Sequence, residues 1–150
     1  MNITVPTFEF VPLHSFGPAV LGASRAEIRT AFLREGFPLE DSLGSSDYFC
    51  DASIQVEYNP SEQANFIGVS SSPRFAAHIY GLDVFDIDAS ELFAIITRHD
   101  NSGAHMFDEY EYLFPNQLVS LWDADQQYDR KGNERRVIWA QVGIRGTQHC

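Results

Sequence analysis

The feature that most constrains the fold is a match between residues 16–32 (FGPAVLGASRAEIRTAF) and residues 80–96 (YGLDVFDIDASELFAII). Aligned at a shift of 64 positions, the two stretches share three identities, against about one expected from typical residue frequencies. The roles of the aligned residues agree more closely, because aromatic, glycine, capping and apolar positions coincide. This agreement predicts a tandem duplication of one structural unit.

Each stretch carries a signal for the start of a helix. Ser24 and Glu27 have the spacing of a capping box, in which the first side chain accepts a backbone N–H and the glutamate reaches back to the cap. Asp88 and Glu91 have the same spacing. Apolar residues then recur at helical spacing, at positions 28, 31 and 32 and at positions 92, 95 and 96. We therefore expect two amphipathic helices.

A strand pattern follows each expected helix end, which Gly36 and Asn101 mark. Residues 54–58 (IQVEY) and residues 119–123 (VSLWD) alternate between apolar and polar side chains, now at a shift of 65 positions. Both segments continue through turn-forming residues into further apolar segments. Each unit is therefore predicted to be a strand or extended lead-in, a helix, and an antiparallel β-meander.

The predicted fold class is α+β, with two tandem repeats, each a helix followed by an antiparallel β-meander, and with the helices packed on the sheet. The repeats run over about residues 8–72 and 75–146. The serine-rich connector at residues 70–74 is too short for a free linker, so we expect one domain over residues 1–150. The sequence leaves open whether the repeats share one sheet, and whether the protein is a monomer or a dimer.

Charge is distributed unevenly along the chain. The 21 acidic and 10 basic residues give a formal net charge of −11, and residues 83–125 contain ten of the acids with a single base, Arg98. Such a segment repels nucleic acid and anionic membranes, and it attracts a basic partner. The simpler alternative is that the acidity keeps the protein soluble.

The sequence favours a cytoplasmic location. The first residues, MNITVPTFEFVP, lack a basic segment followed by an apolar one, and no apolar run reaches about 18 residues. The two cysteines, Cys50 and Cys150, do not form a disulfide framework. We therefore expect a cytoplasmic protein with neither a membrane nor a nucleic acid as its partner.

Three aspartates lie just before the second expected helix. Asp88 aligns with Ser24, so helix capping is its simplest role. Asp83 and Asp86 align with an alanine and a glycine, so the repeated unit does not require them. They lack the ligand spacing and the central glycine of a Ca²⁺ loop. We expect Asp83 and Asp86 on a surface that binds another protein.

The segment DEYEYLFPNQLVSLWDAD, residues 108–125, combines carboxylates with aromatic rings. On a strand, Trp122 lies on the face opposite Val119 and Leu121, which favours its exposure. Aromatic rings supply contact area and acids pair with Arg or Lys, as expected of a surface that binds a basic protein. The predicted contact residues are Asp83, Asp86, Asp108, Glu109, Tyr110, Glu111, Trp122 and Asp123. Burial of the aromatic residues beneath a helix is an equal alternative.

Two other classes of function remain open. A metal-assisted hydrolase would use Asp83, His99, His105 and Asp108, although the H-x5-H spacing matches no common zinc motif. A small-ligand or regulatory module, with a cleft between the repeats, would use Arg25, Arg29 and Arg34 as anion contacts. The chain has no phosphate-binding glycine loop and no serine-nucleophile motif. We expect that the protein is not an enzyme and takes no cofactor or metal.

The order of these motifs resembles that of an uncharacterised bacterial family of tandem repeats. The shared motifs are a small-residue turn, SRAEIR at residues 24–29, DYFCD at residues 47–51, and an alternating strand. The chain also resembles polymorphic-toxin immunity proteins, and in organisation β-lactamase inhibitor protein and the small lipoproteins of outer-membrane assembly. The resemblance and the charge together favour an immunity protein that neutralises a bacterial toxin, expected to be a nuclease whose own site is basic.

Overall fold

The computed structural model describes residues 5–108, 111–122, 129–130 and 137–146. The helices are α1 (Arg25–Arg34) and α2 (Ala89–Asp100). The strands are β1 (Thr7–Val11), β2 (Ser15–Phe16), β3 (Ala19–Val20), β4 (Leu39–Leu43), β5 (Ser46–Phe49), β6 (Ile54–Tyr58), β7 (Ala64–Val69), β8 (Ala76–Ile79), β9 (Leu82–Asp83), β10 (Met106–Asp108), β11 (Glu111–Phe114), β12 (Val119–Trp122), β13 (Asp129–Arg130), β14 (Val137–Ile138) and β15 (Gln141–Arg145).

Two sheets contain most of the strands. The large sheet has eight antiparallel strands in the order β10-β11-β12-β15-β7-β6-β5-β4. The small sheet has five strands in the order β3-β2-β1-β8-β9, and its β1 and β8 run parallel. Strands β13 and β14 form a separate two-stranded ribbon. Because β7 pairs with β15 and β1 pairs with β8, segments distant in the sequence are joined in both sheets.

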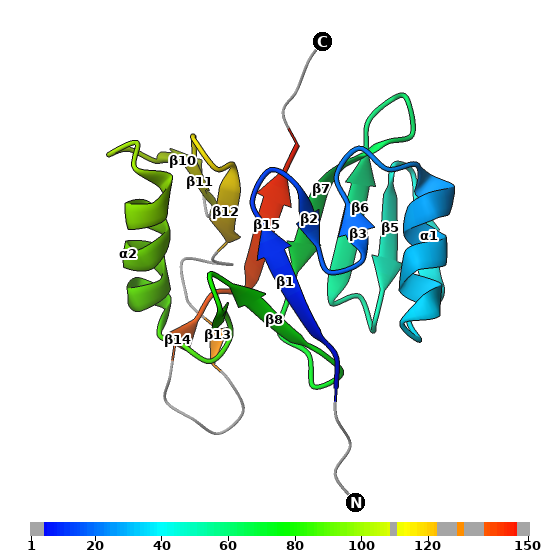
Figure 1. The fold of residues 1–150 in the computed structure, drawn as a ribbon, viewed down its shortest axis with the longest axis horizontal. Helices are drawn as coiled ribbons and strands as arrows, with labels where there is room; N and C mark the ends of the chain where they lie inside the picture. Colours follow the sequence, from blue (N-terminus) through cyan, green and yellow to red (C-terminus); the bar gives the residue numbers. More distant parts are fainter. Residues whose placement is uncertain (1–4, 109–110, 123–128, 131–136, 147–150) are drawn as a thin grey trace, which may run out of the picture.

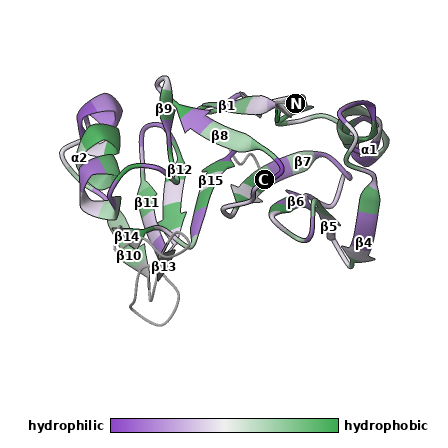
Figure 2. Cartoon of the chain, turned by 90° about the horizontal axis from the view of Figure 1, so that it is seen from below, coloured by the Kyte–Doolittle hydropathy of each residue, from purple (hydrophilic) through white to green (hydrophobic). Residues whose placement is uncertain are grey.

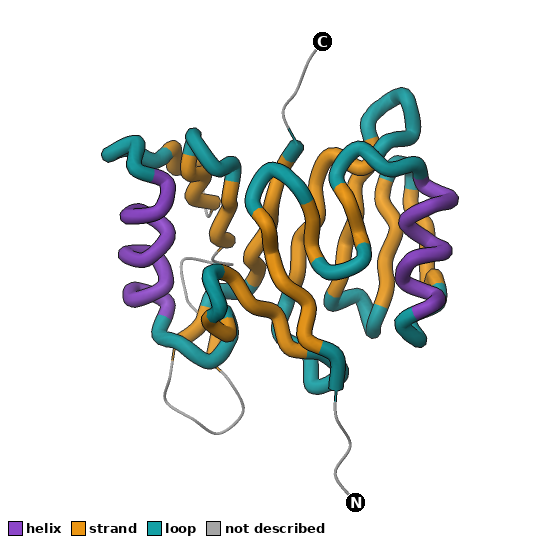
Figure 3. The backbone as a smooth tube through the Cα atoms, viewed as in Figure 1, coloured by secondary structure: helices purple, strands orange, loops and turns teal. Residues whose placement is uncertain are grey.

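The small sheet and the helices cover the same face of the large sheet. Figures 1 and 3 show the small sheet in front of the middle of the large sheet, with α1 and α2 at the two sides. Figure 2, turned by 90°, shows β1, β8 and both helices on one side of the large sheet. We call the opposite face of the large sheet its outer face.

The helix ends follow the local sequence signals closely, with one exception. The Ser24 side chain accepts a hydrogen bond from the backbone N–H of Glu27, and the Glu27 carboxylate accepts one from the backbone N–H of Ser24, so the first capping box is confirmed. Asp88 is the N-cap of α2, but its side chain makes no capping hydrogen bond. The prediction of a second capping box is therefore wrong. Asn101 ends α2 in the left-handed conformation, with φ of 57°.

One cluster of buried apolar side chains lies between the two layers. Period-two alternation places two apolar side chains from each of β6, β7, β12 and β15 on the inner face of the large sheet: Ile54, Val56, Ile67, Val69, Val119, Leu121, Val142 and Ile144. The helices add Ile28 and Phe32 from α1, and Leu92 and Ile96 from α2, as their helical spacing predicted. The cluster therefore draws on both halves of the chain.

The predicted fold class of two α+β repeats, each a helix followed by a meander, is wrong. The described chain is mostly β, with 43% of its residues in strands and only two helices. The segments before the helices form the small sheet, in which β1 pairs with β8. Strands β2, β3 and β9 have two residues each, which is too short to show an alternating pattern in the sequence. Within the described residues, no helix is long and apolar enough to cross a membrane.

A half-buried ion pair fastens α1 to the large sheet. Asp47 on β5 is fully buried and accepts two hydrogen bonds from Arg29, at 2.8 and 2.9 Å, and a third from the Tyr58 hydroxyl at 3.1 Å. Burial alone raises the pKa of Asp47, but the hydrogen bonds from Arg29 and its other partners outweigh this and hold the pKa below its usual value. Burial and the neighbouring Asp47 carboxylate raise the pKa of Tyr58, so its hydroxyl remains a donor.

Two strand glycines make room for an aromatic ring on the outer face. A Cβ atom at Gly68 would lie 2.7 Å from the Phe66 ring, and one at Gly143 would lie 2.8 Å from it. Phe66 is only 8% exposed although it points away from the core, because its ring lies flat over these two positions. A glycine inside a strand often marks a place where another group comes close to the backbone. Here that group is the Phe66 ring of the same sheet.

Replacing Gly143 by alanine is expected to lower the free energy of unfolding by about 1–3 kcal/mol, because the new methyl group displaces the Phe66 ring. Urea unfolding measures this change. The same substitution in a Phe66→Ala background is expected to cost clearly less, since only the 3.1 Å approach of the new Cβ to the Ile67 carbonyl oxygen remains. Gly146→Ala is the matched control, since a Cβ there meets no atom closer than 3.8 Å. An equal cost with and without Phe66 would contradict this packing.

Candidate functional site

Trp122 and Glu111 form a neighbouring pair on the outer face. Trp122 ends β12 and lies opposite Glu111 of β11. Val119 and Leu121 are fully buried, whereas Trp122 is 38% exposed. Trp122 therefore points away from the face of Val119 and Leu121, as the alternation predicted, and it is exposed, which is one of the two alternatives that the sequence left open. Tyr112, the next residue on β11 after Glu111, instead packs against the core from the inner face.

Glu111 is held by an arginine from another strand. Nη2 of Arg145 on β15 lies 2.8 Å from Oε2 of Glu111, and the Arg145 guanidinium carbon lies 5.3 Å from the centre of the Phe66 ring. Together with Gln141, which lies opposite Trp122 on β15, these residues come from four adjacent strands of the large sheet. We call this set, Phe66, Glu111, Trp122, Gln141 and Arg145, the outer-face patch.

Asp83 and Asp86 do not join this patch. Asp83 belongs to β9 of the small sheet, where its carboxylate accepts a hydrogen bond from the backbone N–H of Phe85 at 2.9 Å. Asp86 is exposed in the turn that precedes α2. Both residues therefore lie in the layer on the inner side of the large sheet, whereas Glu111 and Trp122 point to its outer face.

Part of the predicted surface lies outside the described residues. Glu109, Tyr110 and Asp123 are not among them. Asp108 is described in its backbone alone, where it ends β10 opposite Glu111. The outer-face patch therefore rests on Glu111 and Trp122 among the eight predicted contact residues.

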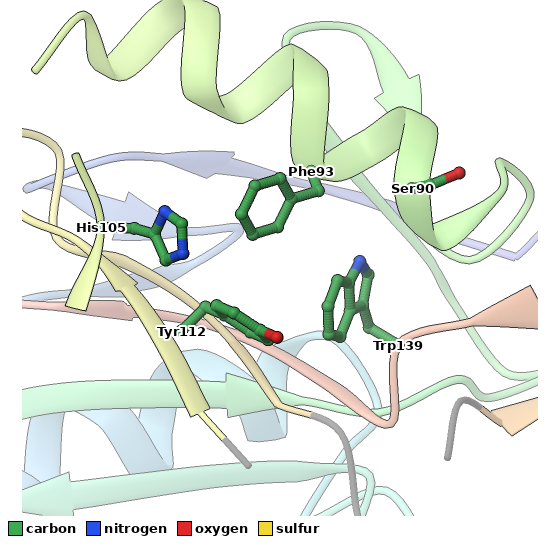
Figure 4. A pocket seen from close by; sticks show the side chains of 5 residues that line it. All are labelled: Ser90, Phe93, His105, Tyr112 and Trp139. Carbon is green, nitrogen blue, oxygen red and sulfur yellow. The ribbon is translucent and has the colours of Figure 1, made fainter. Parts of the chain in front are cut away.

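A pocket that the sequence did not predict lies between α2 and β11. Its volume is about 330 Å³, and its described lining residues are Ser90, Phe93, His105, Tyr112 and Trp139, which we call the aromatic pocket. Figure 4 shows the four rings gathered around a common space, with Ser90 at one side. Phe107, 54% exposed on the edge strand β10, stacks against Tyr112 with ring centres 4.5 Å apart.

Ring packing fixes the walls of the aromatic pocket. The Phe93 ring meets Tyr112 at 85° and Tyr112 meets Trp139 at 72°, with ring centres 5.3 and 5.7 Å apart. Trp139 is 2% exposed and its Nε1–H donates to the Ala89 carbonyl at 2.9 Å. The residues come from α2, β11 and two loops, so no single stretch of sequence carried the signal. The aromatic content of residues 105–114 was the nearest indication.

The side chains considered for a metal or an anion have other roles. His99 stacks on Tyr80 with ring centres 3.6 Å apart, and His105 lines the aromatic pocket. In the part of the chain that the structure describes, no group of three or more His, Cys, Asp or Glu side chains is placed to hold a metal. Arg29 is bound by Asp47, and Arg25 lies 3.1 Å from the Glu62 carboxylate, so two of the three expected anion contacts already have an acidic partner.

Two further titratable groups are shielded from solvent. Burial, with a smaller effect of the Asp100 carboxylate, raises the pKa of Tyr80 to about 12, and its hydroxyl donates to the Gln117 side chain. Cys50 is fully buried, and burial raises the pKa of its thiol. A raised thiol pKa is typical of a packed cysteine and not of a nucleophile.

Comparison of the chain with protein-family models, with curated proteins and with solved structures finds no match.

Proposed function

We propose that this protein is an immunity or inhibitor protein that binds and neutralises a bacterial toxin, a nuclease with a basic surface. The observation that carries the proposal is the exposed Trp122 paired with Glu111 on the outer face of the large sheet in a strongly acidic chain. A large aromatic ring beside charged groups is the arrangement from which binding energy at protein interfaces usually comes.

The rigidity of the outer-face patch supports this proposal. Its residues stand on four hydrogen-bonded strands, and Phe66 is held over two glycines. The ion pair between Glu111 and Arg145 fixes a negative and a positive group beside Trp122 before a partner arrives. A surface already held in its bound shape loses little conformational entropy on association, which leaves more of the contact energy as affinity.

Charge supports the choice of a basic partner. A protein with a net charge of −11 attracts a basic toxin over long range. The active site of a nuclease is cationic because it binds phosphates, so an acidic protein that covers it both associates quickly and excludes nucleic acid. Blocking of this kind requires no catalytic group on the inhibitor.

The proposal predicts a complex whose association depends on salt. The protein is co-purified with inactivated toxins encoded next to its gene, and association is then followed by stopped flow. The association rate constant is expected to fall by at least about tenfold between low and high salt, because long-range attraction is screened. Absence of a complex with every neighbouring toxin, or a rate constant independent of salt, would contradict the proposal.

A further inference from the structure

We propose that the aromatic pocket binds a small molecule with an alkylammonium group. The pocket lies on the inner side of β11 and the outer-face patch on the other side, so this inference goes beyond the proposed function. The volume of about 330 Å³ is at the small end of the range found for small-molecule sites.

The ring geometry suits a compact cation. Two walls, those of Phe93 and Tyr112, meet at 85°, and the Trp139 ring stands at 72° to Tyr112. Rings set at steep angles can turn their electron-rich faces toward one space from different directions. A cation near the face of Trp, Tyr or Phe is attracted by the ring quadrupole, and alkylated ammonium groups are the ligands most often held this way.

The polar groups of the pocket offer little to an anion. The Trp139 indole N–H is already bonded to the Ala89 carbonyl. The remaining polar groups among the described lining residues are the Ser90 and Tyr112 hydroxyls and the His105 ring. An anionic ligand would therefore lose its hydration without meeting an arginine or a lysine among these residues.

The charges next to the pocket also favour a cation. Ser90 lies in the first turn of α2 between Asp88 and Glu91, and both carboxylates are exposed beside it. The positive end of the α2 dipole is equivalent to about half an elementary charge, which two full negative charges outweigh. The described groups at this end of the helix therefore produce a negative local potential.

A matched pair of ligands tests the inference. Choline and 3,3-dimethylbutan-1-ol have the same shape, and only choline is charged. Each is titrated into the full chain labelled with ¹⁵N, at about pH 8, above the range in which histidine side chains usually protonate. The indole N–H signal of Trp139 reports on the pocket, and that of Trp122 on the outer-face patch.

Choline is expected to shift the Trp139 signal, to leave the Trp122 signal in place, and to bind at least about fivefold more tightly than the neutral alcohol. Tyr112→Leu is expected to weaken choline binding by about fivefold or more, and Phe93→Leu gives a second test should the first variant unfold. Trp122→Ala is the control and should bind choline like the wild type. Equal or tighter binding of the alcohol, or no shift with either ligand, overturns the inference and leaves the proposed function untouched.

Discussion

Trp122→Ala is expected to weaken toxin binding by at least about 30-fold, equivalent to about 2 kcal/mol. The ring is 38% exposed on the outer face, between Glu111 on one neighbouring strand and Gln141 on the other. The prediction assumes that the proposed complex buries the ring fully, with the surrounding patch excluding water from its edges. Isothermal titration calorimetry with an inactivated toxin measures the loss of affinity.

The same substitution should leave the fold intact, because Trp122 lies outside the buried core. Its matched control is Leu43→Ala on β4, at the opposite edge of the large sheet, where an apolar side chain is 60% exposed. The control removes a comparable exposed group and is expected to change the affinity by less than about threefold. Equal losses for the two variants would show that the outer-face patch is not the contact surface.

Asp47→Asn is expected to lower the free energy of unfolding by about 2–3 kcal/mol, somewhat less than the loss for a fully buried ion pair, because the Asp47 side chain is buried and the Arg29 side chain is 35% exposed. The substitution keeps the shape of the side chain but leaves Arg29 without its counter-charge and turns one acceptor of the pair into a donor. The Tyr58 hydroxyl also loses a charged acceptor. Thermal unfolding should begin roughly 10 °C lower.

The free energy of unfolding, measured as the pH is lowered, provides a second test of this ion pair. The pKa of Asp47 is lower in the folded state than in the unfolded state, so its ionised carboxylate stabilises the fold. This stabilisation is fully present above about pH 4 and is lost as the pH falls through the folded-state pKa. The wild type should lose more stability than Asp47→Asn in that range. Asp41→Asn, at an exposed carboxylate on the neighbouring β4, is the control and should match the wild type. Parallel acid profiles for wild type and Asp47→Asn would contradict this role.

Local signals in the sequence predicted local structure well. The capping box at Ser24 and the terminating residue Asn101 placed helix ends correctly, and alternation identified β6 and β12. The same alternation placed Trp122 on the face opposite to that of Val119 and Leu121, but it left exposure and burial of the ring equally open, because a second layer can cover either face of a sheet. These signals act over a few residues, so a single sequence contains them in full.

Long-range pairing was beyond the sequence signals. The parallel pairing of β1 with β8 joins residues about 70 positions apart, and nothing in either segment specifies the other. The inward position of Asp47 was also hidden, because a charged residue on a strand is usually taken to face solvent. The aromatic pocket combines residues 90, 93, 105, 112 and 139, whose proximity only the packing of α2 on β11 creates.

The most direct test of the proposed function is a titration of the toxin's nuclease activity with this protein. The toxin is held at a concentration well above the expected dissociation constant, and cleavage of nucleic acid is followed as the protein is added. We predict that activity falls linearly and reaches zero at about one equivalent, and that Trp122→Ala requires a large excess, as expected when a hot-spot residue is removed. Undiminished cleavage in the presence of about tenfold excess protein, by every toxin encoded beside its gene, would contradict the proposal.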